Sequence, residues 1–202
     1  MSAELKGRRI AILLTDGFEQ VELTEPRQAL DAAGAETHLI SSKTDVRGFH
    51  HDQPGDEFSV DVPLDKAKVK DYDGLLLPGG VMNPDSLRID EKAIAFIQAF
   101  VDAGKPIAAI CHGPWPLIET GVTHGRKMTS WPSLRTDLRN AGAEWVDQAV
   151  VCDRGLVTSR NPDDIPAFNK KMIEEFAEGE HGPGLSQPAR AGYQADYETM
   201  TP

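Results

Sequence analysis

The chain has 202 residues and a formal net charge of −11 at pH 7, with charged residues making up 26% of it. This length suits one domain with a sizeable core. The acidic balance argues against binding to nucleic-acid phosphates and to anionic membranes, for which Lys and Arg should dominate.

The start of the chain and the two cysteines indicate the cellular compartment and whether a metal is expected. The start of the chain has two arginines and a short apolar stretch that ends in Asp16-Gly17 without a signal-cleavage pattern, so we expect a cytoplasmic protein. No apolar run approaches membrane-spanning length. The two cysteines, Cys111 and Cys152, form neither a disulfide framework nor a zinc spacing, and no metal is predicted.

The first part of the chain alternates strand and helix patterns, with Gly34 as a helix stop. In chain order we predict a buried strand, a turn, a helix, a second strand, a polar loop and a short edge strand, over 9–15, 16–19, 21–35, 36–41, 42–56 and 58–64.

The second part continues this alternation. Asp90 is the expected N-cap of its first helix and Gly104 the stop. In chain order we predict a buried strand ending in Pro-Gly-Gly, a helix, a buried strand, a helix, a strand, a helix, a short strand with a hairpin and a closing helix, over 72–80, 90–105, 106–111, 112–120, 126–130, 133–142, 143–160 and 163–179.

This order of elements predicts an α/β fold of the doubly wound, flavodoxin-like kind, with a mostly parallel sheet and helices on both faces. Ligands bind such sheets beyond the carboxyl ends of the strands. We therefore expect the turns at 15–19, 78–80 and 110–113 to cluster. Residues 1–179 form the predicted domain, and 180–202, rich in Gly and Pro, a flexible or partner-draped tail.

Cys111 is the first candidate for catalysis, because it ends a buried strand and is followed by His112 and Gly113. A helix N-terminus would lower the pKa of a thiol, and His112 could exchange a proton near neutral pH. The glycine would permit tight packing at the bend. The alternative is an inert core cysteine, and the pattern alone leaves the two possibilities about equal.

Two further elements add to this candidate. The backbone N–H groups of the Pro78-Gly79-Gly80 turn could bind a developing oxyanion. A carboxyl kept protonated by burial could donate a hydrogen bond to the thiolate and move protons. Glu19 and Glu22 are three residues apart, so spacing alone does not choose between them, and either could be an ordinary acid at a helix start.

Taken together, the blocks "FEQVEL", "LLLPGG", "AICHGP", "GVTHGRKMTSWP" and "LVTSRNPDD" resemble the ThiJ/PfpI superfamily, in particular its PfpI-like branch of general stress proteins. The resemblance runs from about Arg9 to Ala177 and implies a domain like that of class I glutamine amidotransferases. The amidotransferase reaction itself is excluded, because His181 lacks the required His-x-Glu pattern.

The resemblance also implies residue roles. Cys111 would be the nucleophile, Glu19 the protonated carboxyl against its sulfur, and His112 a further catalytic residue. Gly79, Gly80 and Gly113 would form the backbone of the oxyanion site, with the N–H groups of Gly80 and His112 as donors.

Three other residues take roles from the resemblance. Asp85 is the nearest equivalent of the partner-subunit acid of PfpI proteases, although its loop is one residue longer. Trp131 would form a pocket wall, where relatives often have Tyr. Arg160 could steer an anionic substrate, or form a surface ion pair.

Three functions compete. The first is a stress-protective cysteine hydrolase, a cofactor-independent glyoxalase or deglycase acting on reactive carbonyls or glycated proteins. The second is an oligomeric intracellular cysteine protease, and the third a redox-sensing or chaperone-like stress protein without turnover. A homo-oligomer is implied in each case, with no cofactor and no nucleic-acid or membrane partner.

Overall fold

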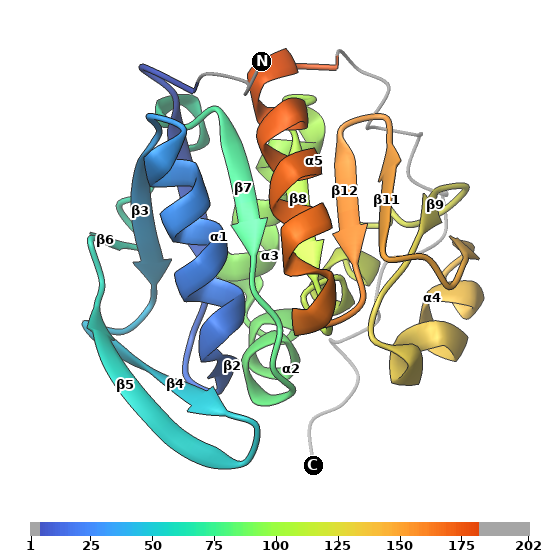
Figure 1. Cartoon of the computed structure of the whole chain (residues 1–202), viewed down its shortest axis with the longest axis horizontal. Helices are drawn as coiled ribbons and strands as arrows, with labels where there is room; N and C mark the ends of the chain where they lie inside the picture. Colours follow the sequence, from blue (N-terminus) through green and yellow to red (C-terminus); the bar gives the residue numbers. More distant parts are fainter. Residues whose placement is uncertain (1–4, 182–202) are drawn as a thin grey trace.

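The computed structural model describes residues 5–181, and the predicted tail lies almost entirely outside them. Its centre is a seven-stranded sheet with the order β11-β12-β8-β7-β1-β3-β6 (Figure 1). All neighbours in this sheet are parallel except β11 and β12, which form a hairpin. The predicted doubly wound α/β fold is confirmed.

The strands of the main sheet and of the two small sheets are all short. The strands are β1 Arg9–Leu13, β2 Phe18–Glu19, β3 Glu36–Ser41, β4 Asp45–His50, β5 Gln53–Ser59, β6 Val62–Pro63, β7 Gly74–Leu77, β8 Ile107–Ile110, β9 Lys127–Met128, β10 Glu144–Trp145, β11 Val150–Asp153 and β12 Leu156–Ser159. The helices are α1 Gln20–Ala32, α2 Met82–Arg88, α3 Glu91–Asp102, α4 Arg135–Asn140 and α5 Ile165–Glu178, with 3₁₀ turns η1 Val69–Asp71, η2 Trp115–Ile118, η3 Pro132–Leu134 and η4 Pro162–Asp164.

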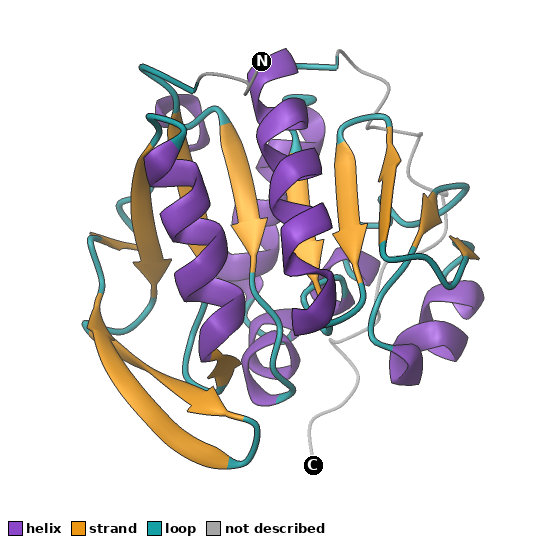
Figure 2. Cartoon of the chain, viewed as in Figure 1, coloured by secondary structure: helices purple, strands orange, loops and turns teal. Residues whose placement is uncertain are grey.

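Helices cover both faces of the sheet, which explains the unbroken apolar composition of its strands. Helices α1 and α5 lie side by side on one face, and α3 lies on the other (Figures 1 and 2). Successive residues of β7 enter different cores: Leu75 and Leu77 pack on the α3 side with Phe100, while Leu76 packs on the α1–α5 side with Phe168. This is the alternation that strand geometry requires.

The loop predicted over 42–56 is wrong, because β4 and β5 form a hairpin that projects beyond the main sheet (Figure 1). Its polar surface, with Pro54 and Gly55, hid the strand pattern. The side chain of Gln20 holds the hairpin through two hydrogen bonds to Asp56, of 2.6 and 2.7 Å. Tertiary contact with α1 therefore stabilises strands that local sequence does not predict.

Two further differences lie near the carboxyl end of the sheet. Helix α2 was not predicted, and the helix expected over 112–120 is wrong, since only the 3₁₀ turn η2 forms there. Two prolines, Pro114 and Pro116, account for this, because neither has an N–H to donate to a helical hydrogen bond.

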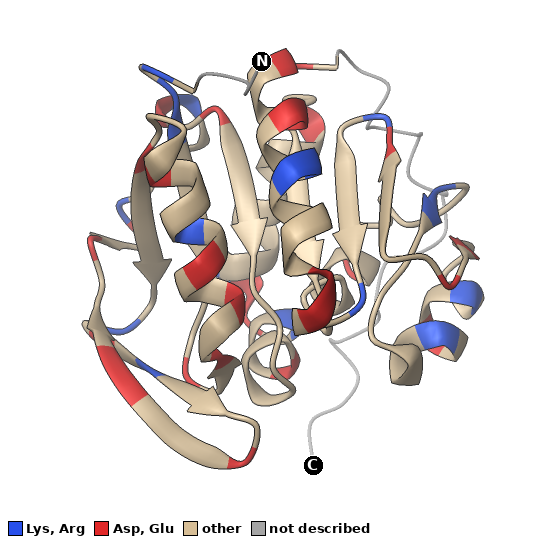
Figure 3. Cartoon of the chain, viewed as in Figure 1, with Lys and Arg blue, Asp and Glu red and all other residues tan. Residues whose placement is uncertain are grey.

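Charges are scattered over this fold. In the view of Figure 3, acidic segments occur on α1, α5 and β5, and basic segments lie between them and on α4. Among the described residues, no helix is both long and apolar enough to cross a membrane.

Candidate active site

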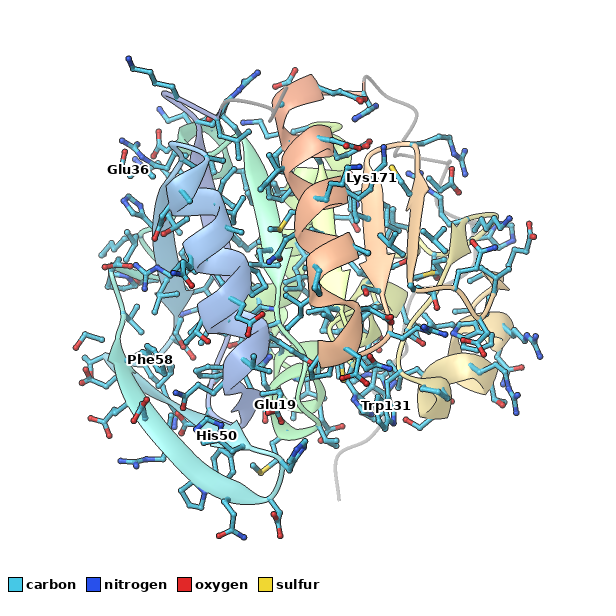
Figure 4. All side chains as sticks on the ribbon, in the orientation of Figure 1. Glu19, Glu36, His50, Phe58, Trp131 and Lys171 are labelled. Carbon is cyan, nitrogen blue, oxygen red and sulfur yellow. The ribbon has the colours of Figure 1, made fainter. Side chains whose placement is uncertain are left out.

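The turns that follow β1, β7 and β8 meet at the carboxyl edge of the sheet, as expected. Asn83 of α2 joins two of them: its side-chain oxygen accepts from the N–H of Thr15 at 2.8 Å, and its amide donates to the carbonyls of Pro78 and Gly79. Asn83 is fully buried. Figure 4 places Glu19 and Trp131 at this same end of the molecule, toward which the strand arrows of Figure 1 point.

Cys111 directly follows β8 and has a φ of +62°, a left-handed conformation that side chains other than glycine rarely adopt. Its N–H is hydrogen-bonded to the carbonyl of Ser159, so the adjacent strand β12 holds the bend in place. The next turn needs Gly113, because a Cβ there would collide with the carbonyl oxygen of Leu77. A strained, rigid bend therefore presents the thiol, which is 7% exposed.

The carboxyl beside this thiol is Glu22, which corrects the assignment of Glu19. Glu22 lies in the first turn of α1, is fully buried, and its carboxyl lies beside the thiol of Cys111, with Oε1 left without a hydrogen-bond partner among the described residues. Its Oε2 accepts from the N–H of Gly79 at 2.8 Å. Burial raises the pKa of Glu22 to about 8, so the carboxyl is protonated at neutral pH.

Glu19 points elsewhere. Its Oε2 accepts from the backbone N–H of His51 at 3.0 Å, which ties the end of β2 to the tip of the β4–β5 hairpin. Glu22 lies within α1 and shares the buried stripe of Pro26 and Leu30, at intervals of four residues, whereas Glu19 precedes the helix as its N-cap residue. Spacing in the sequence does not separate the two acids, and the burial of Glu22 in the structure does.

His112 also contacts the sulfur of Cys111. Its Nδ1 is 3.3 Å from Sγ of Cys111, and its Nε2 is 3.1 Å from Oγ of Ser133. The indole of Trp131 stacks on the imidazole with a centroid separation of 6.0 Å. Trp131 is 40% exposed, and its role as a pocket wall stays a prediction. Burial lowers the pKa of His112 to about 4, so the ring is neutral at pH 7.

Backbone donors also converge on the sulfur. The backbone N–H groups of His112 and Gly80 face the thiol of Cys111 and act to lower its pKa, which favours the anionic form. Gly80 reaches this position with a φ of +75°, and a Cβ there would collide with the carbonyl oxygen of Gly17. The N–H groups of Gly79 and Gly113 are not available to an oxyanion, because they donate to Glu22 and to the carbonyl of Ile110.

The thiol is not activated in the way the sequence suggested. No α-helix starts behind Cys111, and burial, followed by the Glu22 carboxyl, raises the pKa of the thiol. Cys111 and Glu22 form a coupled buried pair, in which a proton on one favours the charge on the other. Nδ1 of His112, 3.3 Å from Sγ, is within reach of the thiol proton.

The structure does not bring two of the predicted residues to the sulfur. Asp85 is exposed on α2, and no hydrogen bond or ion pair joins it to His112 within the described part of the chain. Arg160 follows β12 and is held by Asp164 at 2.8 and 3.0 Å and by Asp147 at 2.7 Å. These contacts favour the ion-pair alternative for Arg160.

Cys152 lies on β11, away from this site. Its thiol donates to Oε2 of Glu175 at 2.9 Å, and Oε1 of the same carboxylate accepts from the N–H of Gly155 at 3.0 Å. Glu175, Glu178 and His181 are near enough to one another to hold a metal ion, but exposed acidic groups are common without one, and we assign none.

Comparison with known proteins identifies the family of the chain. Residues 8–175 match the model of the DJ-1/PfpI family. The chain is 45% identical over 168 residues to general stress protein 18 of Bacillus subtilis, which covers 83% of this chain and 96% of the relative.

Two further proteins extend the comparison. Protein/nucleic acid deglycase 2 of Escherichia coli is 43% identical over 169 residues, covering 82% of this chain and 96% of the relative. The crystal structure of DJ-1beta from Drosophila melanogaster superposes with a TM-score of 0.77 at 27% identity, covering 88% of this chain and 95% of that one. On the matched residues and the shared fold, the chain belongs to the DJ-1/PfpI family.

Proposed function

We propose that this protein is a stress-protective cysteine hydrolase that acts on reactive aldehydes or on the adducts they form with proteins, without a cofactor. One observation carries the proposal: both a protonated carboxyl, Glu22, and a neutral imidazole, His112, lie beside the sulfur of Cys111. This arrangement supplies both an acid and a base to a thiol that is held on a rigid bend. The relatives named a stress protein and a deglycase support it.

The first step is addition of the thiol to the aldehyde carbon of a 2-oxoaldehyde such as methylglyoxal. The S–C bond forms while the thiol proton moves to Nδ1 of His112 and the Glu22 proton moves to the carbonyl oxygen. The product is a hemithioacetal, with Glu22 ionised and His112 protonated. The N–H groups of Gly80 and His112 stabilise the oxygen while negative charge develops on it.

The second step moves hydrogen between the two substrate carbons. The Glu22 carboxylate removes the proton from the carbon bonded to sulfur, and the imidazolium gives its proton to the neighbouring carbonyl oxygen, forming an enediol. Glu22 then returns its proton to the second carbon and takes one from the hydroxyl of the first. A thioester remains, with Glu22 again protonated and His112 neutral. Both groups have returned to their resting states.

Hydrolysis completes the cycle. Water adds to the thioester carbon, the C–S bond breaks, and the sulfur recovers its proton. The product is a 2-hydroxy acid, lactate from methylglyoxal or glycolate from glyoxal. No external oxidant or reductant is needed, because one carbon is oxidised as its neighbour is reduced.

The test is depletion of methylglyoxal with formation of lactate by the purified protein, alongside release of the adduct from a glycated peptide. We expect turnover that disappears in Cys111→Ser. Substrate loss that is the same in wild type and Cys111→Ser would refute the proposal. Casein cleavage is measured in parallel, since Cys111-dependent peptide hydrolysis without aldehyde turnover would favour the protease instead. The redox-sensor function and the homo-oligomer stay predictions.

A further inference from the structure

His112 has a different partner on each ring nitrogen, and only one of them belongs to the reacting pair. Nδ1 faces the sulfur of Cys111 at 3.3 Å, whereas Nε2 faces Oγ of Ser133 at 3.1 Å. The imidazole is buried, at 8% exposure, and Ser133 lies on the exposed turn η3. The contact with Ser133 lies outside the pair formed by His112 and the thiol.

The identity of the protonated nitrogen decides whether His112 can act as a base. A neutral imidazole has one N–H and one lone pair. To accept the thiol proton, Nδ1 must hold the lone pair, so the hydrogen must be on Nε2. In a buried ring that N–H requires an acceptor, and the hydroxyl of Ser133 is in the position to accept it.

The fold fixes the place of this hydroxyl. The N–H of Trp131 donates to the carbonyl of Cys111 at 2.8 Å, which joins the start of the η3 turn to the bend itself. Pro132 begins the turn and Leu134 anchors it in the core. The stacked ring of Trp131 limits rotation of the imidazole. These contacts hold the hydroxyl of Ser133 within hydrogen-bond distance of His112.

We infer that Ser133 is a positioning residue, whose hydroxyl holds His112 in the tautomer with hydrogen on Nε2 and so aims the Nδ1 lone pair at the thiol of Cys111. When the thiol proton moves to Nδ1, the Nε2–H remains hydrogen-bonded to Ser133, and Ser133 itself neither gains nor loses a proton. The effect on catalysis rests on the proposed function, but the effect on the tautomer does not.

The direct test is nitrogen-15 NMR of the histidine side chains, which distinguishes the two neutral tautomers. His112→Gln identifies the signal by its loss. We expect His112 to have hydrogen on Nε2 in wild type and in Ser133→Thr, and a shift toward the other tautomer in Ser133→Ala. Ser86→Ala, which removes an exposed hydroxyl from α2, is the matched control and should leave the signal unchanged.

Kinetics give the second readout. Loss of one hydrogen bond to a neutral ring predicts a fall of about 2- to 10-fold in kcat for Ser133→Ala, with KM unchanged and recovery in Ser133→Thr. Ser133→Asp should raise the pKa of His112, because a carboxylate stabilises the imidazolium. The acid limb of the pH–rate profile should therefore move to higher pH.

The outcomes separate this inference from the proposed function. Hydrogen on Nδ1 in wild type would overturn the inference, and so would an unchanged tautomer in Ser133→Ala. If Cys111→Ser retains aldehyde turnover, the proposed function fails while the NMR result still decides the role of Ser133. If Cys111→Ser is inactive but Ser133→Ala matches wild type in both measurements, only the inference fails.

Discussion

The two cysteines form a natural comparison, because each thiol lies against a buried glutamate. Cys111 faces Glu22 and Cys152 faces Glu175. Burial raises the pKa of both thiols, that of Cys152 to about 12 with Glu175 adding to the effect. A thiol beside a carboxyl is therefore not by itself a reactive site.

The surroundings of the two sulfurs differ in three respects. Cys111 has a histidine nitrogen at 3.3 Å, two backbone N–H donors and a φ of +62°. Cys152 lies in a regular antiparallel strand pair, and its carboxylate partner also accepts from the turn at Gly155. If Cys111 is the nucleophile, as proposed, three features separate it from Cys152: a nearby base, backbone donors for the anion, and a bend that places the residue after the end of its strand.

The largest expected effect comes from exchanging sulfur for oxygen at each position. Cys111→Ser should lower aldehyde turnover by at least about 10³-fold, because the nucleophile is lost. Cys152→Ser should stay within about 2-fold of wild type. Steady-state rates of lactate formation measure both. Equal losses in the two variants would mean that the proposed difference between the sulfurs is wrong.

The two acids of the α1 region give the next test. Glu22→Gln keeps a neutral hydrogen-bond donor near Cys111 but cannot move a proton, so we expect a fall in kcat of about 10²-fold or more. Glu19→Gln, the matched control, should change kcat by less than about 2-fold, since Glu19 contacts the hairpin instead. A larger loss in Glu19→Gln than in Glu22→Gln would restore the assignment made from the sequence.

The raised pKa of Glu22 also predicts how stability depends on pH. The folded protein holds this proton up to about pH 8, whereas the unfolded chain releases it near 4.5. Its contribution to the free energy of unfolding is thus fully present below 4.5 and is lost as pH rises through 8. Relative to wild type, Glu22→Gln should become more stable across this window, by on the order of 1–4 kcal/mol.

Urea unfolding at several pH values measures this difference. His112 contributes with the opposite sign, because its pKa is lowered to about 4 and stability is lost as pH falls from about 6.5 toward that value. Since both proteins contain His112, its contribution cancels in the comparison. Parallel pH profiles for wild type and Glu22→Gln would contradict the protonated carboxyl.

The smallest effect is expected at the mouth of the site. Trp131→Ala removes a pocket wall and should raise KM for the aldehyde by up to about 10-fold, with a lesser change in kcat from the freer imidazole. Trp131→Tyr keeps a stacking ring, so its KM should lie between that of wild type and that of Trp131→Ala. An unchanged KM in Trp131→Ala would show that the substrate does not use this wall.

The sequence predicts the framework well where local pattern and burial agree. The buried strands and α3, with its Asp90 cap, follow directly from apolar periodicity. The β4–β5 hairpin does not, because its register depends on Gln20 from α1. In the site, Cys111 and His112 are candidates from the pattern and from the family resemblance, but the choice of Glu22 over Glu19 depends on which carboxyl the fold buries. Ser133 carries no pattern in the sequence, since its role depends on a contact across 21 residues.

The hydrogen bond from Trp131 N–H to the carbonyl of Cys111 has a consequence for how such a protein could diversify. It connects main chain to main chain, so the side chain at position 131 can be exchanged without disturbing the backbone bend that holds Cys111. Substitutions at position 131 could then change substrate preference, while the residues that make and break bonds to the substrate stay the same.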